Sequence, residues 1–276
     1  MSTPSGGERV RVKARNAGFA LNVYSLGVRA VRSLPRDIET LVPSLFIPVF
    51  FYLVNVGIFS DFVGMADFGI EYHEFQIPVA IMFAVTGLSR ASVLVLDIQR
   101  GYFDRLSLAP VNRVAMLVGM ILADMLMAVL VTIPVLVLSF FWGVFTVDNI
   151  SWFDTGVLGF ALFIVITVAW SLAYNLITYG IALKTGNPAI VNTSFIIFFP
   201  VLFFSTLYLP LDQLTGWLGA VARVNPTTYV LDGMRSLLTP GWDWVALGLC
   251  ALSIAIVFAL TLTFALWGLN ARLRRK

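Results

Sequence analysis

The sequence predicts an all-α integral membrane protein with six transmembrane helices and both termini in the cytoplasm. Its composition is the first reason: 59% of the 276 residues are hydrophobic and only 12% are charged, whereas soluble domains carry roughly 25% charged residues. The second reason is a set of six apolar runs, each near the roughly 20 residues that a helix needs to cross the hydrocarbon layer. The third is that basic residues gather in the segments on one side of these runs.

Residues 1–39 are expected to form a cytoplasmic tail that ends in an interfacial helix. From Phe19 to Leu34, apolar and polar residues each recur at steps of three or four, which is typical of a helix with one apolar and one polar face. A basic amphipathic helix beside a span lies in the cytoplasmic membrane interface. There it either only anchors the chain or also helps to dock a partner. The basic residues nearest the first span are Arg29, Arg32 and Arg36.

A single transmembrane domain follows at residues 40–268, and a basic cytoplasmic tail at 269–276 ends the chain. The first apolar run begins only near Leu41, so we expect a retained signal anchor and not a cleaved signal peptide. The third and fourth runs are long enough to tilt or to extend beyond the bilayer. The expected spans are about 40–60, 77–96, 114–145, 155–183, 188–209 and 243–268.

The distribution of charge gives the orientation of these spans. Basic residues precede span one, lie between spans two and three and between spans four and five, and follow span six. The opposite loops are mainly acidic and contain only Arg223 and Arg235 as bases. The positive-inside rule therefore places both termini in the cytoplasm.

The segment 210–242, before the last span, has a mixed character. It is too apolar for a free loop, yet it is too interrupted by polar residues, Gly and Pro for a span. Two short helices that dip into the outer leaflet fit this pattern best. Asn225 and Pro226 are expected to form the turn between them.

Motifs for catalysis or metal binding do not occur in the sequence. The only histidine, His73, is expected in an external loop beside Glu71 and Glu74, and no second histidine completes a metal site. The single cysteine, Cys250, excludes an intrachain disulfide. No GxxxxGK[ST] phosphate loop is present, so we expect neither an enzyme nor an ATP site on this chain.

Two ionisable residues, Arg90 and Asp124, fall within the expected spans. They either pair with each other or with the backbone inside the bundle, or they serve an ion-coupled carrier. Other polar residues and several aromatic residues at membrane depth either hold helices together and face lipid or line a path for an amphiphilic substrate. The candidates for that path are Asn55, Tyr174, Asn175, Asn192, Phe195, Phe199 and Phe203.

Three motifs resemble one known family over nearly the whole chain. "RSLPRDIETLVPSLFIPVFFYLV" (32–54) is similar to the family's Arg-Asp approach to the first span, and "RGYFDRLSLAPVNR" (100–113) to its segment after span two. "NPTTYVLDGMRSLL" (225–238) resembles the segment that precedes its final span. The family is that of type-2 ABC export permeases, and the drug- and lipid-efflux branch of the daunorubicin-resistance kind is the most similar.

The resemblance implies a permease subunit of an ATP-driven exporter in a bacterial cell membrane. It implies two copies of a separate ATPase that carry ATP and Mg²⁺, a second permease that is identical or a paralogue, and no cofactor on this chain. Membrane lipids are further partners, and nucleic acid is not. The substrate is expected to be an amphiphilic drug, lipid or glycolipid that leaves the cytoplasm or inner leaflet by alternating access. The alternatives are an ion-coupled secondary carrier and a polysaccharide-exporting permease.

The resemblance also assigns roles to two groups of residues. Residues 97–113 match the cytoplasmic helix that couples the permease to the ATPase, although a solvated polar turn would have a similar composition. Its candidate contacts are Asp97, Arg100, Tyr102, Phe103, Asp104, Arg105 and Leu106. The outer gate is expected in 225–235, where Asp232 and Arg235 at i,i+3 either close the gate or simply stabilise one helix. The candidate gate residues are Asn225, Pro226, Tyr229, Asp232 and Arg235.

Overall fold

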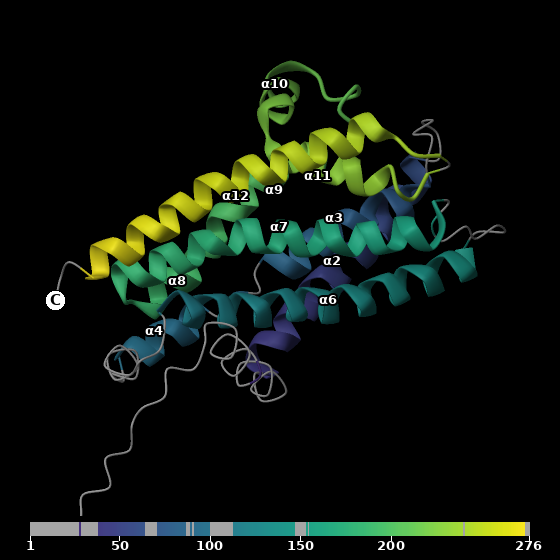
Figure 1. Cartoon of the computed structure of the whole chain (residues 1–276). Coiled ribbons are helices and arrows are strands. Elements are labelled where there is room, and N and C mark those ends of the chain that lie inside the picture. Colours follow the sequence, from purple (N-terminus) through teal and green to yellow (C-terminus); the bar gives the residue numbers. More distant parts are fainter. Residues whose placement is uncertain are drawn as a thin grey trace, which may run out of the picture.

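The computed structural model describes an elongated bundle of helices (Figure 1). The described residues are 28, 38–63, 71–86, 89, 91–99, 113–146, 153, 155–239 and 241–273. Every regular element in these ranges is helical, which confirms the all-α class. The predicted interfacial helix before residue 38 lies almost wholly outside the described residues.

Five of the six expected spans are confirmed as helices that are long and apolar enough to cross a membrane. The long helices are α2 (Ile38–Val63), α6 (Arg113–Thr146), α7 (Gly156–Thr185) and α12 (Trp244–Leu273). The second span is formed by α3 (Tyr72–Thr86) and α4 (Ala91–Gln99). The matching spans are Val42–Phe59, Tyr72–Leu96, Val118–Phe141, Gly156–Thr185 and Trp244–Ala271.

The predicted span at 188–209 is not one continuous helix. It consists of α8 (Pro188–Thr193), the 3₁₀ turn η2 (Ser194–Ile197) and α9 (Phe198–Phe203), and the chain bends from residue 204 onwards. Pro200 explains the interruption, because it has no N–H for the carbonyl of Ile196 and its ring collides with that carbonyl in a regular α-helix. The six-span count therefore stays a prediction.

Span two begins earlier than the hydropathy pattern indicates. The polar residues before position 77 belong to the first turn of α3, so His73 is helical and does not lie in a loop as expected. Gln76 explains why this polar start is stable. Its amide donates to the Tyr72 hydroxyl at 2.8 Å and to the carbonyl of Leu207 at 3.1 Å.

Helices α7 and α12 pack side by side along most of their length (Figure 1). Two glycines permit the close approach near one end. A Cβ on Gly268 would lie 2.7 Å from the carbonyl oxygen of Gly180, and a Cβ on Gly180 would lie 2.5 Å from the Phe264 ring. Small residues of this kind allow helix backbones in membranes to approach each other. The two glycines therefore hold α7 and α12 in close contact.

The two ends of the bundle differ in construction. At one end, α4 and α8 pack against α7 around an apolar cluster that includes Leu94, Leu183 and Leu269, and the chain reaches its carboxyl terminus at this end (Figure 1). The other end holds α11 (Pro226–Arg235) between α3, α7 and α12. The short α10 (Gly216–Val224) precedes α11. Two short helices separated by Asn225 are thus confirmed, whereas their insertion into the outer leaflet stays a prediction.

Candidate functional site

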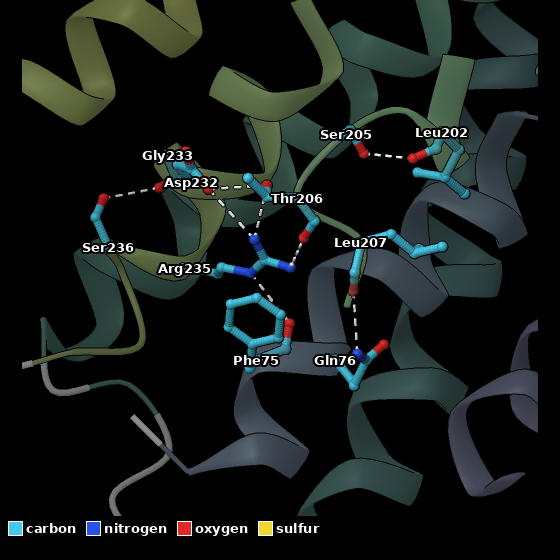
Figure 2. A network of polar contacts seen from close by, with 10 residues as sticks. All are labelled: Phe75, Gln76, Leu202, Ser205, Thr206, Leu207, Asp232, Gly233, Arg235 and Ser236. Atoms are coloured by element: carbon cyan, nitrogen blue, oxygen red, sulfur yellow. Dashed lines mark hydrogen bonds and ion pairs between the residues drawn. The ribbon is translucent and has the colours of Figure 1, made fainter. Parts of the chain in front are cut away.

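Arg235 lies at the end of α11 and joins three separate parts of the chain. Its Nε donates to the carbonyl of Phe75 at 3.1 Å, and Nη2 donates to the carbonyl of Thr206 at 2.7 Å. Nη1 donates to the Thr206 hydroxyl at 2.9 Å and forms an ion pair with Asp232 at 3.3 Å. Figure 2 shows these bonds converging on one guanidinium. We call this set, with Gln76 and Leu207, the outer network.

The electrostatics of the outer network favour a charged Arg235. Burial lowers the pKa of its guanidinium to about 10, and Asp232 opposes that shift, so the group stays protonated at neutral pH. Burial also raises the pKa of Asp232 above its ordinary 3.8, against the opposing effects of Arg235 and Thr206. The Arg235 guanidinium carbon also lies 3.4 Å from the centre of the Phe75 ring, where cation–π attraction adds to the hydrogen bonds.

Residues 205–207, which follow α9, are fixed by the outer network on two sides. The Thr206 hydroxyl donates to Asp232 at 3.1 Å, and the carbonyl of Leu207 accepts from Gln76. The segment after the broken helix is therefore fastened to both α3 and α11. Any displacement of α11 must move it or break these bonds.

Asn225 joins α9 to α11 through both ends of its amide. Its side-chain oxygen accepts from the N–H of Thr227 at 3.0 Å and so caps α11. Its nitrogen donates to the carbonyls of Val201 and Phe204 at the end of α9. Pro226 at the first helical position fits the same role, since it needs no hydrogen bond there.

A continuous series of aromatic rings leads from α2 to Arg235. Successive ring centres lie 5.0 to 6.5 Å apart, within the range of favourable aromatic pairs. Phe203 is 37% exposed, so part of the series reaches the surface. We call it the aromatic track, and its members in order are Phe51, Phe83, Phe203, Tyr208, Phe59, Tyr72 and Phe75.

The structure brings together some of the expected substrate-path residues and not others. Phe199 and Phe203 stack at 6.2 Å and both contact Phe83. Tyr174 and Asn175 are buried in α7, and the Tyr174 ring meets Phe198 at 5.4 Å. Asn55 is buried in α2. The side chains of Asn192 and Phe195 lie outside the described residues.

Of the two predicted intramembrane ionisable residues, the structure describes Asp124. Asp124 is buried in α6 and accepts a hydrogen bond from the Tyr179 hydroxyl of α7 at 2.7 Å. Arg90 lies outside the described residues, so its pairing with Asp124 stays a prediction. Tyr179 was not singled out by the sequence, because a tyrosine at a membrane helix position has no distinctive signal.

The predicted outer-gate residues cluster on α11 and its preceding turn, as the motif 225–238 suggests. Tyr229 donates from its hydroxyl to the carbonyl of Arg223, which ties α11 back to α10. The sequence missed Phe75 and Thr206, which are partners of Arg235, and Gln76, which binds the neighbouring Leu207 carbonyl. Gln76 gave the one usable signal, as an amide at the edge of an apolar run.

The predicted coupling residues fall almost entirely outside the described residues. Asp97 lies in α4, although its side chain is not described. The predicted interfacial arginines also lie outside the described residues. The predicted residues outside the described ranges are Arg29, Arg32, Arg36, Arg100, Tyr102, Phe103, Asp104, Arg105 and Leu106.

Metal binding finds no support in the described part of the chain. No group of three or more His, Cys, Asp or Glu side chains is close enough there to hold an ion.

Comparison with known proteins places the chain in one family. Residues 22–239 match the family described as ABC-2 type transporter. The daunorubicin resistance ABC transporter permease protein DrrB1 of Streptomyces coeruleorubidus is 30% identical over 79% of this chain and 75% of its own length. The probable doxorubicin resistance permease DrrC of Mycobacterium tuberculosis is 23% identical over 75% and 72%. The putative transport permease ycf38 of Cyanophora paradoxa is 26% identical over 79% and 74%. This membrane protein therefore belongs to the ABC-2 type transporter family.

Proposed function

We propose that this protein is the permease subunit of an ATP-driven exporter that moves a drug-like or lipid-like amphiphile out of the cytoplasm or inner leaflet. The observation that carries the proposal is the family match together with relatives named for daunorubicin and doxorubicin resistance. These relatives cover about three quarters of the chain, so the similarity is not confined to one motif.

The aromatic track supports an amphiphilic substrate. Flat apolar molecules bind well between aromatic side chains, which supply large contact area and specific stacking geometry. The half-buried and exposed rings of Phe51, Phe59 and Phe203 give such a molecule access to the series. A hydrophilic polysaccharide finds few hydrogen-bonding groups on this surface, so the track favours the drug- and lipid-efflux branch.

The energy for transport enters, in this proposal, through a separate ATPase that contacts residues 97–113. The 276 residues contain no phosphate loop. The start of this segment lies in α4, whose last residue Gln99 donates to the carbonyl of Gly186 in the α7–α8 turn at 3.1 Å. Through this hydrogen bond, a displacement of residues 97–113 would be transmitted to Gly186, and so to α7 and to the interrupted helix that begins with α8.

The outer network supplies the proposed outer gate. Arg235 and Asn225 tie α11 to α3, to residues 205–207 and to the end of α9. A change in α8 at the ATPase end thus reaches α11 through α9 and its hydrogen bonds to Asn225. Alternating access by a rigid shift of such a connected unit fits the known repertoire of transporter motions.

The ion-coupled alternative has weaker support. It needs Arg90 and Asp124 to exchange ions or protons, yet the Asp124 carboxylate accepts a hydrogen bond from Tyr179. Family membership also favours ATP as the energy source.

The test is co-purification of this chain with the ATPase subunit encoded beside it, followed by ATPase measurement in proteoliposomes with daunorubicin. We expect a stable complex whose ATP hydrolysis is stimulated by the drug and which exports the drug only when ATP is present. Export by this chain alone under a proton gradient would instead establish the ion-coupled carrier.

A further inference from the structure

The Tyr174 hydroxyl is a buried polar group without a hydrogen-bond partner among the described residues. Tyr174 is 4% exposed, and its hydroxyl makes no hydrogen bond in the described part of the chain. Burying an unsatisfied hydroxyl is unfavourable, and phenylalanine would fill nearly the same volume without that cost. A tyrosine at this position therefore needs a reason that the resting fold does not supply.

Several neighbouring side chains on α7 do have hydrogen-bond partners, so the helix is not generally poor in partners. The Trp170 ring nitrogen donates to Thr86 at 3.3 Å, and the Tyr179 hydroxyl donates to Asp124 at 2.7 Å. The Thr178 and Ser89 hydroxyls lie 2.6 Å apart. Of the two tyrosines of α7, only Tyr174 therefore has a hydroxyl without a partner in the described part of the chain.

Tyr174 lies beside the break in the fifth apolar run. Its ring meets the edge of Phe198 at 5.4 Å with an interplanar angle of 73°. Phe198 is the first residue of α9 and directly follows the 3₁₀ turn at 194–197. By helical rise, Tyr174 is roughly 27 Å from one end of α7 and roughly 16 Å from the other, which is well inside the membrane. Substrate sites of transporters commonly lie at that depth beside discontinuous helices.

Phe198 separates Tyr174 from the aromatic track. The rings of Phe198 and Phe83 lie 5.8 Å apart and meet edge to face. Phe83 in turn contacts Phe203, which is partly exposed. A flat molecule on the track would therefore reach the Tyr174 hydroxyl once α9 carries Phe198 aside.

We propose that Tyr174 is the specificity-determining hydrogen-bond donor of the substrate site, and that the site takes planar aromatic amphiphiles that carry a carbonyl acceptor. The inference rests on the proposed export function and adds the substrate group that the chain recognises. The aromatic rings bind the flat face of the molecule, and the hydroxyl selects for the carbonyl. In this structure, the Phe198 ring lies against Tyr174 and covers the proposed site.

The test compares Tyr174→Phe with Tyr52→Phe, using two tricyclic probes of similar shape. Anthraquinone carries carbonyl acceptors and anthracene carries none. Tyr52 is the matched control, because its buried hydroxyl does have a partner and donates to Ser139 at 3.1 Å. Binding is measured by quenching of tryptophan fluorescence with the permease alone in nanodiscs, and ATPase stimulation is measured with the assembled complex.

We expect Tyr174→Phe to weaken anthraquinone binding about three- to tenfold, the range for one lost neutral hydrogen bond, and to leave anthracene binding unchanged. Its thermal unfolding midpoint should not fall, whereas that of Tyr52→Phe should. Equal anthraquinone affinity in Tyr174→Phe and the wild type would overturn the inference, as would an equal loss for both probes or a lower unfolding midpoint.

Failure of the proposed export function gives a different result. The complex would then fail to form, or ATP hydrolysis would not respond to daunorubicin or to either probe. A loss of anthraquinone selectivity in Tyr174→Phe nanodiscs would still support the site itself, because that measurement does not involve the ATPase.

Discussion

Arg235 binds Phe75 through both the backbone and the ring of that residue. Its Nε donates to the Phe75 carbonyl at 3.1 Å, and its guanidinium carbon lies 3.4 Å from the ring centre. The two residues are 160 positions apart in the sequence. This contact therefore joins α3 to α11 at this end of the bundle through one side chain that is only 7% exposed.

Substitution of Arg235 by Met should destabilise the protein by about 2–4 kcal/mol, because the carbonyls of Phe75 and Thr206 lose their donors in a buried setting. Arg235→Lys should have an intermediate effect, since an ammonium keeps the charge but cannot reproduce the planar fork. Thermal unfolding in detergent measures both. Arg223→Met is the control, because Arg223 is exposed and only its main-chain oxygen is used. Equal stability of Arg235→Met and Arg223→Met would contradict the assignment.

The raised pKa of Asp232 predicts a specific pH dependence of stability. Because burial favours the protonated carboxyl in the folded state, the folded protein binds more protons than the unfolded chain between pH 3.8 and the raised pKa. Stability contributed by this group is present at low pH and decreases as pH rises through that interval.

Asp232→Asn isolates this effect, since an amide oxygen still accepts from Thr206 and Arg235 but does not titrate. The difference in unfolding midpoint between the wild type and Asp232→Asn should change in favour of the variant as pH rises above 3.8. A difference that is independent of pH in this interval would show that the carboxyl titrates normally.

Asn225→Asp tests the connection between α9 and α11. Aspartate keeps the cap on Thr227 but loses the donors to Val201 and Phe204 and brings a negative charge against those carbonyls. We expect a loss of about 2–3 kcal/mol for this buried site. Asn187→Asp is the matched control, because exposed Asn187 only accepts from the N–H of Ala189, which aspartate does as well. Denaturation is measured for both variants in parallel. Asn225→Asp should lose stability and Asn187→Asp should keep it, and an equal effect of the two substitutions would contradict the connection between α9 and α11.

The features that the sequence predicted well depend on composition or on neighbouring residues. Five spans were predicted, because hydropathy summed over about 20 residues depends little on fold details. The turn at Asn225 was predicted because an Asn-Pro pair suits a cap followed by a first helical residue. The interruption of 188–209 was missed, since the summed hydropathy of that run does not register the effect of one proline.

The candidate site was predicted only in part, because many of its partners are backbone atoms. Arg235 and Asp232 were predicted as a pair from their i,i+3 spacing, and their ion pair is confirmed. The acceptors at Phe75 and Thr206 are main-chain oxygens, which every residue type carries, so no residue pattern indicates them. The same holds for Tyr174, whose missing partner becomes visible only when its surroundings are known.

Two glycines of α12 should respond in opposite ways to the same substitution. Gly268→Ala places a Cβ 2.7 Å from the backbone of Gly180 and should destabilise the protein by about 1–3 kcal/mol through overpacking. Gly248→Ala meets no atom within 4 Å and should stabilise the helix by up to about 1 kcal/mol. Unfolding midpoints of the two variants provide the measurement. Destabilisation of similar size in both would mean that close contact between α7 and α12 is not the cause.

Reversal of two charges in the proposed coupling segment should uncouple the permease from its ATPase. Asp104→Lys combined with Arg105→Glu leaves the net charge of the segment unchanged but inverts its pattern, and mismatched charges at an interface cost several kcal/mol. We expect drug-stimulated ATPase activity and export to fall by at least about tenfold, while the purified permease keeps its unfolding midpoint. The control exchange is Asp212→Lys with Arg223→Glu, two exposed residues of the segment between α9 and α11. If residues 97–113 contact the ATPase, only the first pair affects activity, whereas unchanged export in that pair would mean that the ATPase binds elsewhere on the cytoplasmic face.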